Sequence, residues 1–207
     1  RFGQRSVKGG FIALKGEAGY QPEVLRGGLH YLMPIQYVVH TAPLVTIPQG
    51  KMGYIFARDG EPLSAMQTLA SNITANDFQD VRAFLKDGGQ RGPQRQILRE
   101  GTYAINLAQF IVITDERVYY MPLSRDDSSV IQSMMEVIAE RDGFRPVVIK
   151  DQDDKAGIVT VHDGPALSPG EIIANIVGGD RENALTYHNN FQMPDRFLQA
   201  GGMRGRQ

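Results

Sequence analysis

The sequence predicts an α+β fold in which small antiparallel sheets are combined with short helices. Two runs rich in β-branched or aromatic residues, Met52 to Arg58 and Ala156 to His162, each end in Asp-Gly. This is a strong tight-turn signal, because glycine accepts a positive φ without strain. Two segments with apolar residues at helical spacing, around Phe84 and Phe197, each stop at a Gly-Gly pair suited to a helix C-cap.

These patterns form an internal repeat. Nine of the seventeen positions from Phe78 to Gln94 recur from Phe191 to Gln207 at one fixed offset. Upstream, the segment that begins at Lys51 and contains Asp59-Gly60 recurs from Lys155 at a slightly shorter offset, so the second copy carries nine extra residues before Phe191. A third repeated pattern begins at Gly19 and again at Gly92, at its own fixed offset. Gly19, Gln21, Leu25-Arg26 and Gly28 correspond to Gly92, Gln94, Leu98-Arg99 and Gly101, and an apolar stretch follows each set. We therefore expect the tail of one unit, one whole unit and most of a third.

The remaining elements follow from local patterns. Asp126 to Glu140 carries Val130, Ile131, Met134, Met135 and Ile138 at helical spacing and is the best predicted helix, ending near Gly143. Further strands are expected at Phe11–Leu14, Leu29–Met33, Tyr37–Ile47, Tyr103–Thr114, Arg117–Met121 and Val147–Lys150. A domain boundary is expected near Lys150 to Asp154, which divides the chain into residues 1–150 and 151–207.

Composition excludes several classes of function. The net charge is -1, from 22 basic and 23 acidic side chains, and no cluster of Lys and Arg is present, which argues against a nucleic-acid partner. The chain has no cysteine, so it forms no disulfide and offers no thiolate nucleophile or metal ligand. No apolar run approaches the roughly 20 residues that cross a bilayer. We expect this piece to be soluble by itself, with any membrane anchor outside it.

One segment resembles a signature of the band 7 (stomatin, prohibitin and flotillin, or SPFH) superfamily. Arg26-Gly27-Gly28-Leu29-His30-Tyr31-Leu32-Met33-Pro34 is similar to its early Pro-Gly-Leu-His motif, with Arg-Gly in place of the usual Pro-Gly approach, and Val45-Thr46-Ile47-Pro48 follows as in that family. The segments Gly50 to Gly60 and Glu100 to Asn106 resemble the larger bacterial flotillin-like proteins with tandem SPFH modules.

The resemblance implies a first SPFH-like module in residues 1–150, with the tail of a preceding unit, and the start of a second, truncated module in residues 151–207. It implies a non-enzymatic, membrane-associated scaffold that assembles laterally with copies of itself into a ring, cage or microdomain. The runner-up is a wall module of a soluble vault-like shell. A third interpretation is a hydrolase or ligand-binding domain that uses His162-Asp163 or an acidic linker.

The residues with chemical potential favour no catalytic, cofactor or metal site. None of His30, His40, His162 and His188 is spaced for zinc, so we expect surface or half-buried strand histidines. Asp151, Asp153 and Asp154 lack the glycine and glutamate of a calcium loop, so a solvated linker is expected.

Other candidates have structural explanations. The two Gly-Gly-x-Arg-Gly segments follow a helix, so capping turns are expected rather than a phosphate cradle, with Arg91 and Arg204 capping carbonyls or pairing with a carboxylate of another unit. Ser128, Ser129 and Ser168 are in no nucleophile elbow, and Met134-Met135 is expected in the core.

Overall fold

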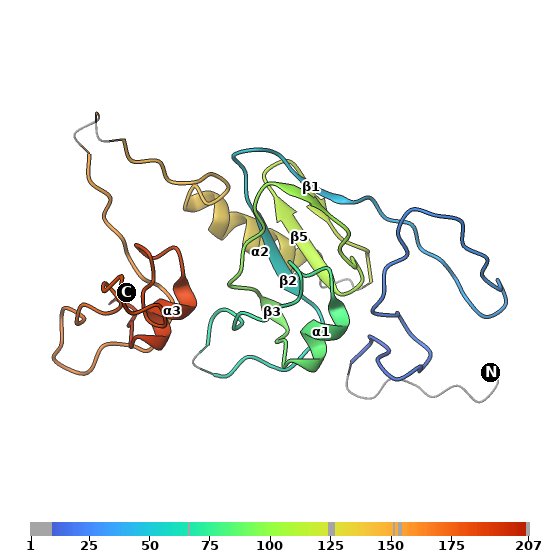
Figure 1. Cartoon of the computed structure of the whole chain (residues 1–207), viewed down its shortest axis with the longest axis horizontal. Helices are drawn as coiled ribbons and strands as arrows, with labels where there is room; N and C mark the ends of the chain where they lie inside the picture. Colours follow the sequence, from blue (N-terminus) through green and yellow to red (C-terminus); the bar gives the residue numbers. More distant parts are fainter. Residues whose placement is uncertain (1–9, 66, 124–126, 151, 153–154, 206–207) are drawn as a thin grey trace.

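The centre of the molecule is a four-stranded antiparallel sheet with the strand order β3-β2-β5-β6 (Figure 1). The computed structural model describes residues 10–65, 67–123, 127–150, 152 and 155–205. The sheet contains β2 (Gly53–Ala57), β3 (Gly92–Pro93), β5 (Phe110–Thr114) and β6 (Val118–Tyr119), and a second antiparallel sheet pairs β1 (Val45–Ile47) with β4 (Gly101–Tyr103). The helices are α1 (Val81–Lys86), α2 (Asp127–Glu140) and α3 (Pro194–Gln199). The α+β class with antiparallel sheets is therefore confirmed.

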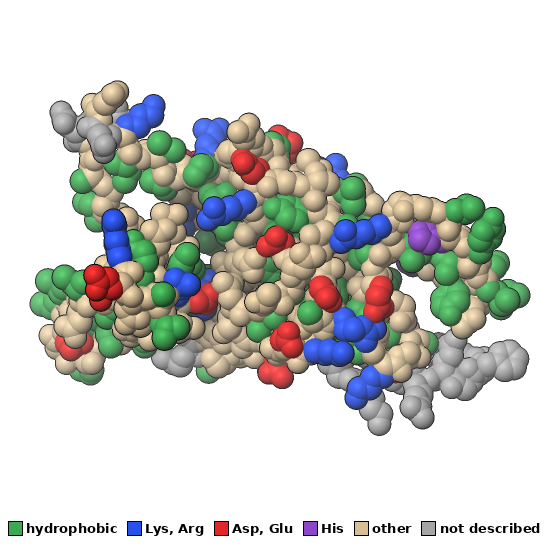
Figure 2. All heavy atoms as spheres, viewed as in Figure 1, with side chains coloured by type: hydrophobic (Ala, Val, Ile, Leu, Met, Phe, Trp, Pro, Cys, Tyr) green, Lys and Arg blue, Asp and Glu red, His purple; other side chains and the backbone are tan. Residues whose placement is uncertain are grey.

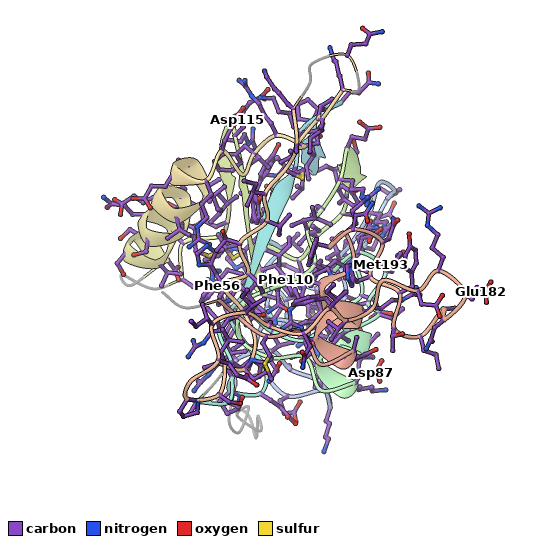
Figure 3. The ribbon with its side chains drawn as sticks, turned by 90° about the vertical axis from the view of Figure 1, so that its left-hand side faces the viewer. Phe56, Asp87, Phe110, Asp115, Glu182 and Met193 are labelled. Carbon is purple, nitrogen blue, oxygen red and sulfur yellow. The ribbon has the colours of Figure 1, made fainter. Side chains whose placement is uncertain are left out.

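Strand β5 organises the core because both of its faces are covered. Its five residues are all buried, and the first four alternate between two hydrophobic clusters as the period-2 geometry of a strand requires. Phe110 and Val112 face the larger cluster, which includes Phe84 of α1. Ile111 and Ile113 face the smaller cluster, which Ile138 of α2 covers. Figure 3 shows Phe110 in the interior, with α2 on one side of the sheet.

Helix α2 begins at Asp127, one residue after the predicted start, and residues 124–126 lie outside the described part of the chain. Its end agrees with the prediction, since the Gly143 N–H donates to the Ile138 carbonyl at 2.8 Å. The apolar face is only partly covered. Ile138 is buried and Met134 packs against the sheet, but Met135 is 37% exposed, so the expectation that both methionines lie in the core is wrong for Met135.

Several expected strands are absent from the described residues, because a strand needs a hydrogen-bonded neighbour that these segments lack. Phe11–Leu14 contributes a single bridge from Ile12 to Tyr20. Only the last three residues of Tyr37–Ile47 form a strand. The other predicted strands that do not form are Leu29–Met33, Val147–Lys150 and Ala156–His162.

The predicted strand Tyr103–Thr114 is interrupted by a turn. The Asn106 side chain accepts from the Ala108 N–H at 3.0 Å, and the Asn106 carbonyl accepts from the N–H groups of Gln109 and Phe110. Asparagine favours turns in this way, because its side chain forms hydrogen bonds with nearby backbone groups that a strand would otherwise use. The run is thereby divided into β4 and β5, which belong to different sheets.

The contact between β2 and the end of α2 predicts a loss of stability at alkaline pH. The Tyr54 hydroxyl donates to the Gly143 carbonyl, and burial raises the pKa of Tyr54 above the ordinary value of 10.0. The folded state therefore holds this proton more tightly than the unfolded state, so stability is complete below about pH 10 and falls as pH rises through the folded pKa. We expect Tyr54→Phe to flatten this alkaline fall in urea unfolding curves measured from pH 8 to 11.

Tyr54→Phe should also cost about 0.5–1.5 kcal/mol at neutral pH, because it removes one hydrogen bond. The matched control is Tyr31→Phe, whose ring is 91% exposed. If the free energy of unfolding falls as steeply at alkaline pH in Tyr54→Phe as in the original chain, the prediction is contradicted.

Candidate interaction surfaces

The N-terminal segment repeats the local hydrogen bonding that surrounds β3, at the offset that relates Gly19 to Gly92. The Gln21 side-chain amide donates to the Gly19 carbonyl at 3.1 Å, and the Gln94 amide donates to the Gly92 carbonyl at 2.9 Å. Each amide also donates to the carbonyl four residues upstream, which is that of Glu17 for Gln21, at 3.2 Å, and that of Gln90 for Gln94, at 2.8 Å. The correspondence seen in the sequence therefore extends to side-chain geometry.

The same offset relates the turn before β5 to a turn in residues 33–37. The N–H groups of Gln36 and Tyr37 donate to the Met33 carbonyl at 3.0 and 2.9 Å. Those of Gln109 and Phe110 donate to the Asn106 carbonyl at the same two distances. Residues 37–41 thus follow the turn as β5 does, but they form no strand and their apolar side chains are exposed.

The C-terminal unit repeats the surroundings of α1, at the offset that relates Phe78 to Phe191. Three consecutive residues before each helix have positive φ: 47°, 51° and 62° in one copy and 47°, 52° and 64° in the other, for Asn76, Asp77 and Phe78 and for Asn189, Asn190 and Phe191. Three successive side-chain-bearing residues in this region are unusual. Helices α1 and α3 then begin and end at equivalent positions.

Both helices end in the predicted glycine cap. Gly88 and Gly201 have positive φ, at 82° and 91°. The next residue, Gly89 or Gly202, donates its N–H to the carbonyl of Phe84 or Phe197 at 2.8 Å, as in a Schellman motif. Pro194 opens α3 as expected. The predicted capping role of the two Gly-Gly-x-Arg-Gly segments is thereby confirmed.

The Asp-Gly turn meets the Gly-Gly loop in both copies. The Arg91 N–H donates to the Glu61 carbonyl at 2.8 Å, and the Arg204 N–H donates to the Pro165 carbonyl at 2.9 Å. The β2–β3 pairing of Ala57 with Gly92 has a counterpart in the hydrogen bond from the Gly205 N–H to the Val161 carbonyl, at 3.0 Å. Residues 155–205 therefore carry counterparts of β2, α1 and β3.

The close approach of these turns gives a testable prediction. Gly60 has φ of 136°, and a Cβ there would clash with the Gly89 carbonyl and lie 3.1 Å from the Arg91 nitrogen. Gly60→Ala should cost about 1–3 kcal/mol, from backbone strain and overpacking. Gly179→Ala is the control, because its Cβ would meet nothing within 4 Å. Equal unfolding midpoints for the two variants in thermal melts would show that the turn relaxes freely.

A charged junction joins the complete module, which contains β1 to β6, α1 and α2, to the C-terminal unit, residues 155–205. The Arg95 guanidinium, 8% exposed, pairs with the Asp163 carboxylate at 2.8 Å and also with Asp195. Asp163 lies in the second Asp-Gly turn and Asp195 in the first turn of α3. The sequence predicts that Arg91 and Arg204 cap carbonyls or pair with a carboxylate of another unit, but neither forms a salt bridge among the described residues. No sequence pattern marked Arg95 as the residue at this junction, because its partners Asp163 and Asp195 are distant from it in the sequence.

Asp59, the counterpart of Asp163 in the first Asp-Gly turn, forms hydrogen bonds with a segment that precedes it in the chain. Asp59 accepts from the N–H groups of Phe11 and Ile12 at 2.9 and 3.1 Å. A second contact is the salt bridge of Arg82 with Glu23, at 2.6 Å. Residues 11–23 are therefore fixed to the complete module, and residues 24–44 extend away from it (Figure 1).

The histidines do not converge. His30 and His40 are exposed: the His30 Nε2 lies 2.8 Å from the Arg26 carbonyl, and the His40 ring centroid lies 5.9 Å from that of Tyr20. His162 is exposed, and its neighbour Asp163 is engaged by Arg95. His188 is buried in a loop rather than placed in a strand as predicted. Its Nδ1 accepts from the Phe191 N–H at 2.9 Å, so the Nε2–H donates to the Val177 carbonyl.

The other chemical candidates remain apart. Asp151, Asp153 and Asp154 of the predicted linker lie outside the described residues, as does most of the predicted domain boundary. Ser168 is exposed, and its N–H donates to Glu171 at 3.3 Å. Ser128 lies at a shallow hollow of about 570 Å³ between α2 and β6, together with apolar residues such as Ile131 and Met135. Within the described part of the chain, no three His, Asp or Glu side chains are grouped to hold a metal ion.

The exposed apolar side chains concentrate at the two ends of the molecule. Among the described residues, and apart from Tyr120, Met135 and Val137, every exposed large hydrophobic side chain lies in residues 24–44 or 147–193. Figure 2 shows one such gathering at the right-hand end, over the extended N-terminal segment. Exposed apolar patches of this kind mark interaction surfaces.

Comparison with known proteins gives no identification: no family model, no curated protein and no solved structure matches the chain. In the described part of the chain, no helix is both long enough and apolar enough to cross a membrane.

Proposed function

We propose that this chain is a non-enzymatic, repeat-built scaffold that assembles with copies of itself. The observation that carries the proposal is the repeat of one module along the chain, together with the apolar side chains that the repeated parts expose. Phe191 is 42% and Val159 is 56% exposed, whereas their counterparts Phe78 and Ile55 are buried. A repeat unit buries its hydrophobic face against a neighbour, so uncovered units favour association.

The membrane-associated, band 7-like setting belongs to the same proposal. It is supported by the Arg26 to Pro34 motif and the tandem arrangement of units. A hydrolase centred on His162-Asp163 has less support, because the Asp163 carboxylate pairs with Arg95 and no second acid, base or nucleophile contacts His162 among the described residues.

Electron microscopy of the purified chain tests the proposal, first in solution and then after incubation with vesicles of neutral or anionic lipids. We expect rings, cages or linear arrays with a repeating spacing. Arrays that form only on vesicles would favour the membrane scaffold, and arrays that form equally without lipid would favour a shell. Dispersed particles of monomer size under every condition would contradict self-assembly.

A further inference from the structure

Two equivalent positions of the repeat make the contact with the part of the chain that comes before it. The first is the aspartate of the Asp-Gly turn, which is Asp59 in the complete module and Asp163 in the C-terminal unit. Both aspartates accept hydrogen bonds from the preceding part. The second is the second residue of the helix, which is Arg82 in α1 and Asp195 in α3. The same surface of the repeated unit therefore forms both junctions.

The other side of each junction follows a segment whose geometry is also repeated, Gly19 to Gln21 or Gly92 to Gln94. Glu23 comes two residues after the first segment, and Arg95 comes one residue after the second. In both segments the glutamine amide donates to the glycine carbonyl, at 3.1 and 2.9 Å. The backbone that presents the two charged side chains thus has the same local hydrogen bonding in both places.

The charges at the two junctions are reversed. At the first, the preceding residue is acidic and the helix residue is basic, and Glu23 pairs with Arg82 at 2.6 Å. At the second, the preceding residue is basic and the helix residue is acidic, since Arg95 pairs with Asp195. If the C-terminal unit met the first segment instead, the carboxylates of Asp195 and Glu23 would face each other. Like charges in contact are unfavourable and suppress wrong partners.

The parts joined in this way follow one another along the longest axis of the molecule. In Figure 1, residues 11–23, helix α1 and helix α3 lie in this order from right to left. Figure 3 looks along that axis, and there α3, beside the label of Met193, lies in front of α1, beside that of Asp87. The two helices are therefore displaced mainly along the axis. Equivalent contacts with such a displacement are typical of a linear array of stacked repeats.

We infer that successive units are stacked through one repeated joint, and that the paired charges at this joint determine which unit follows which. Glu23 and Arg82 select the complete module for the segment before it, and Arg95 and Asp195 select the C-terminal unit for the complete module. Each preceding surface thus fits a unit with the opposite charge at the second position of its helix. This inference rests on the proposed scaffold function, because it names the contact that orders the units of the scaffold.

Charge exchange at the second joint tests the inference. The variants also carry Asp163→Asn, so that the pair of Arg95 and Asp195 is tested by itself. We expect Asp195→Arg to accelerate hydrogen exchange in residues 160–205 by about tenfold or more, because two guanidinium groups then meet. Arginine is already the residue at the equivalent position of α1, so the helix accommodates it. Adding Arg95→Asp should return the exchange rates to within about threefold of those of Asp163→Asn alone.

A control variant separates repulsion at the joint from a general effect of charge. Glu182→Arg makes the same kind of charge reversal in the C-terminal unit, at an exposed side chain that lies at the outer edge of the molecule in Figure 3. It should leave exchange in residues 160–205 unchanged. Exchange in β2 and β5 should stay unchanged in every variant and shows that the complete module remains folded. Equal acceleration by Glu182→Arg and Asp195→Arg would overturn the inference.

The first joint gives an independent test with a smaller expected effect. The side chains of Arg82 and Glu23 are 36% and 61% exposed, so solvent screens their interaction. Glu23→Arg should accelerate exchange of the Phe11 and Ile12 amides, which donate to the turn aspartate, by about threefold. Adding Arg82→Glu should reverse this change. If neither exchanged pair restores protection, the paired charges do not select the units and the inference is overturned.

The measurements separate this joint from the broader proposal. Hydrogen exchange at dilutions where the chain is monomeric reports on the joint, and electron microscopy of concentrated samples reports on self-assembly. Arrays formed by the original chain, together with protection that the exchanged pairs do not restore, would overturn the joint and leave the scaffold function standing. Restored protection in a chain that forms no array would support the joint and contradict self-assembly.

Discussion

Phe84→Ala is expected to lower the free energy of unfolding by about 3–5 kcal/mol, the usual cost of removing a large buried aromatic side chain. Phe84 is fully buried, and its ring contacts those of Phe78 and Phe110, with centroids 6.1 and 5.1 Å away. Because these three rings join α1 to the central sheet, the cavity would form where the two elements meet. Urea unfolding followed by circular dichroism measures the change.

The repeat supplies an internal control for this substitution. The helical spacing of the apolar residues in both copies predicts that Phe84, Leu85, Phe197 and Leu198 are all buried. Phe84 is buried, but its counterpart Phe197 in α3 is only partly buried, as are Leu85 and Leu198, so the prediction is wrong for these three. Phe197→Ala should therefore cost under half as much as Phe84→Ala in the monomer. If Phe84→Ala costs less than about 1 kcal/mol, the site collapses around the missing ring and the core is less rigid than its packing indicates.

Arg95→Met is expected to release the C-terminal unit from the complete module, at a cost of about 3 kcal/mol, because removing one partner leaves the carboxylates of Asp163 and Asp195 uncompensated. Their side chains are 19% and 22% exposed, which places the cost at the lower end for a buried pair. The cost is local, since the core around Phe110 does not depend on Arg95. Hydrogen exchange should accelerate in residues 160–205 and stay unchanged in β2 and β5.

Arg91→Met is the matched control, because Arg91 is exposed and forms no salt bridge among the described residues. Adding Asp163→Asn and Asp195→Asn to Arg95→Met should restore part of the lost protection, since the uncompensated charges are then gone. Faster exchange throughout the molecule would mean that Arg95 supports the whole fold instead of the junction.

Local sequence signals predicted the features whose geometry is determined by neighbouring residues. The Asp-Gly turns, the Gly88 and Gly201 caps and the bounds of α1 and α3 agree with the patterns because glycine and proline restrict or permit backbone angles directly. The internal repeat was visible for the same reason, since its matched positions are turn glycines and core aromatic residues. The left-handed φ of three successive residues before each helix carried no comparable signal.

The sequence by itself determined the antiparallel α+β class and the positions of the turns and caps, and the tertiary structure decided which apolar runs became strands. Residues 53–57 and 157–161 occupy equivalent positions in the repeat, but among the described residues only the first form a strand, because β5 lies beside them. Likewise Phe110 is buried and Tyr37 is exposed, although both follow the same turn. Turn and cap geometry depends on a few adjacent residues, whereas strand formation and burial require a partner that is distant in the sequence.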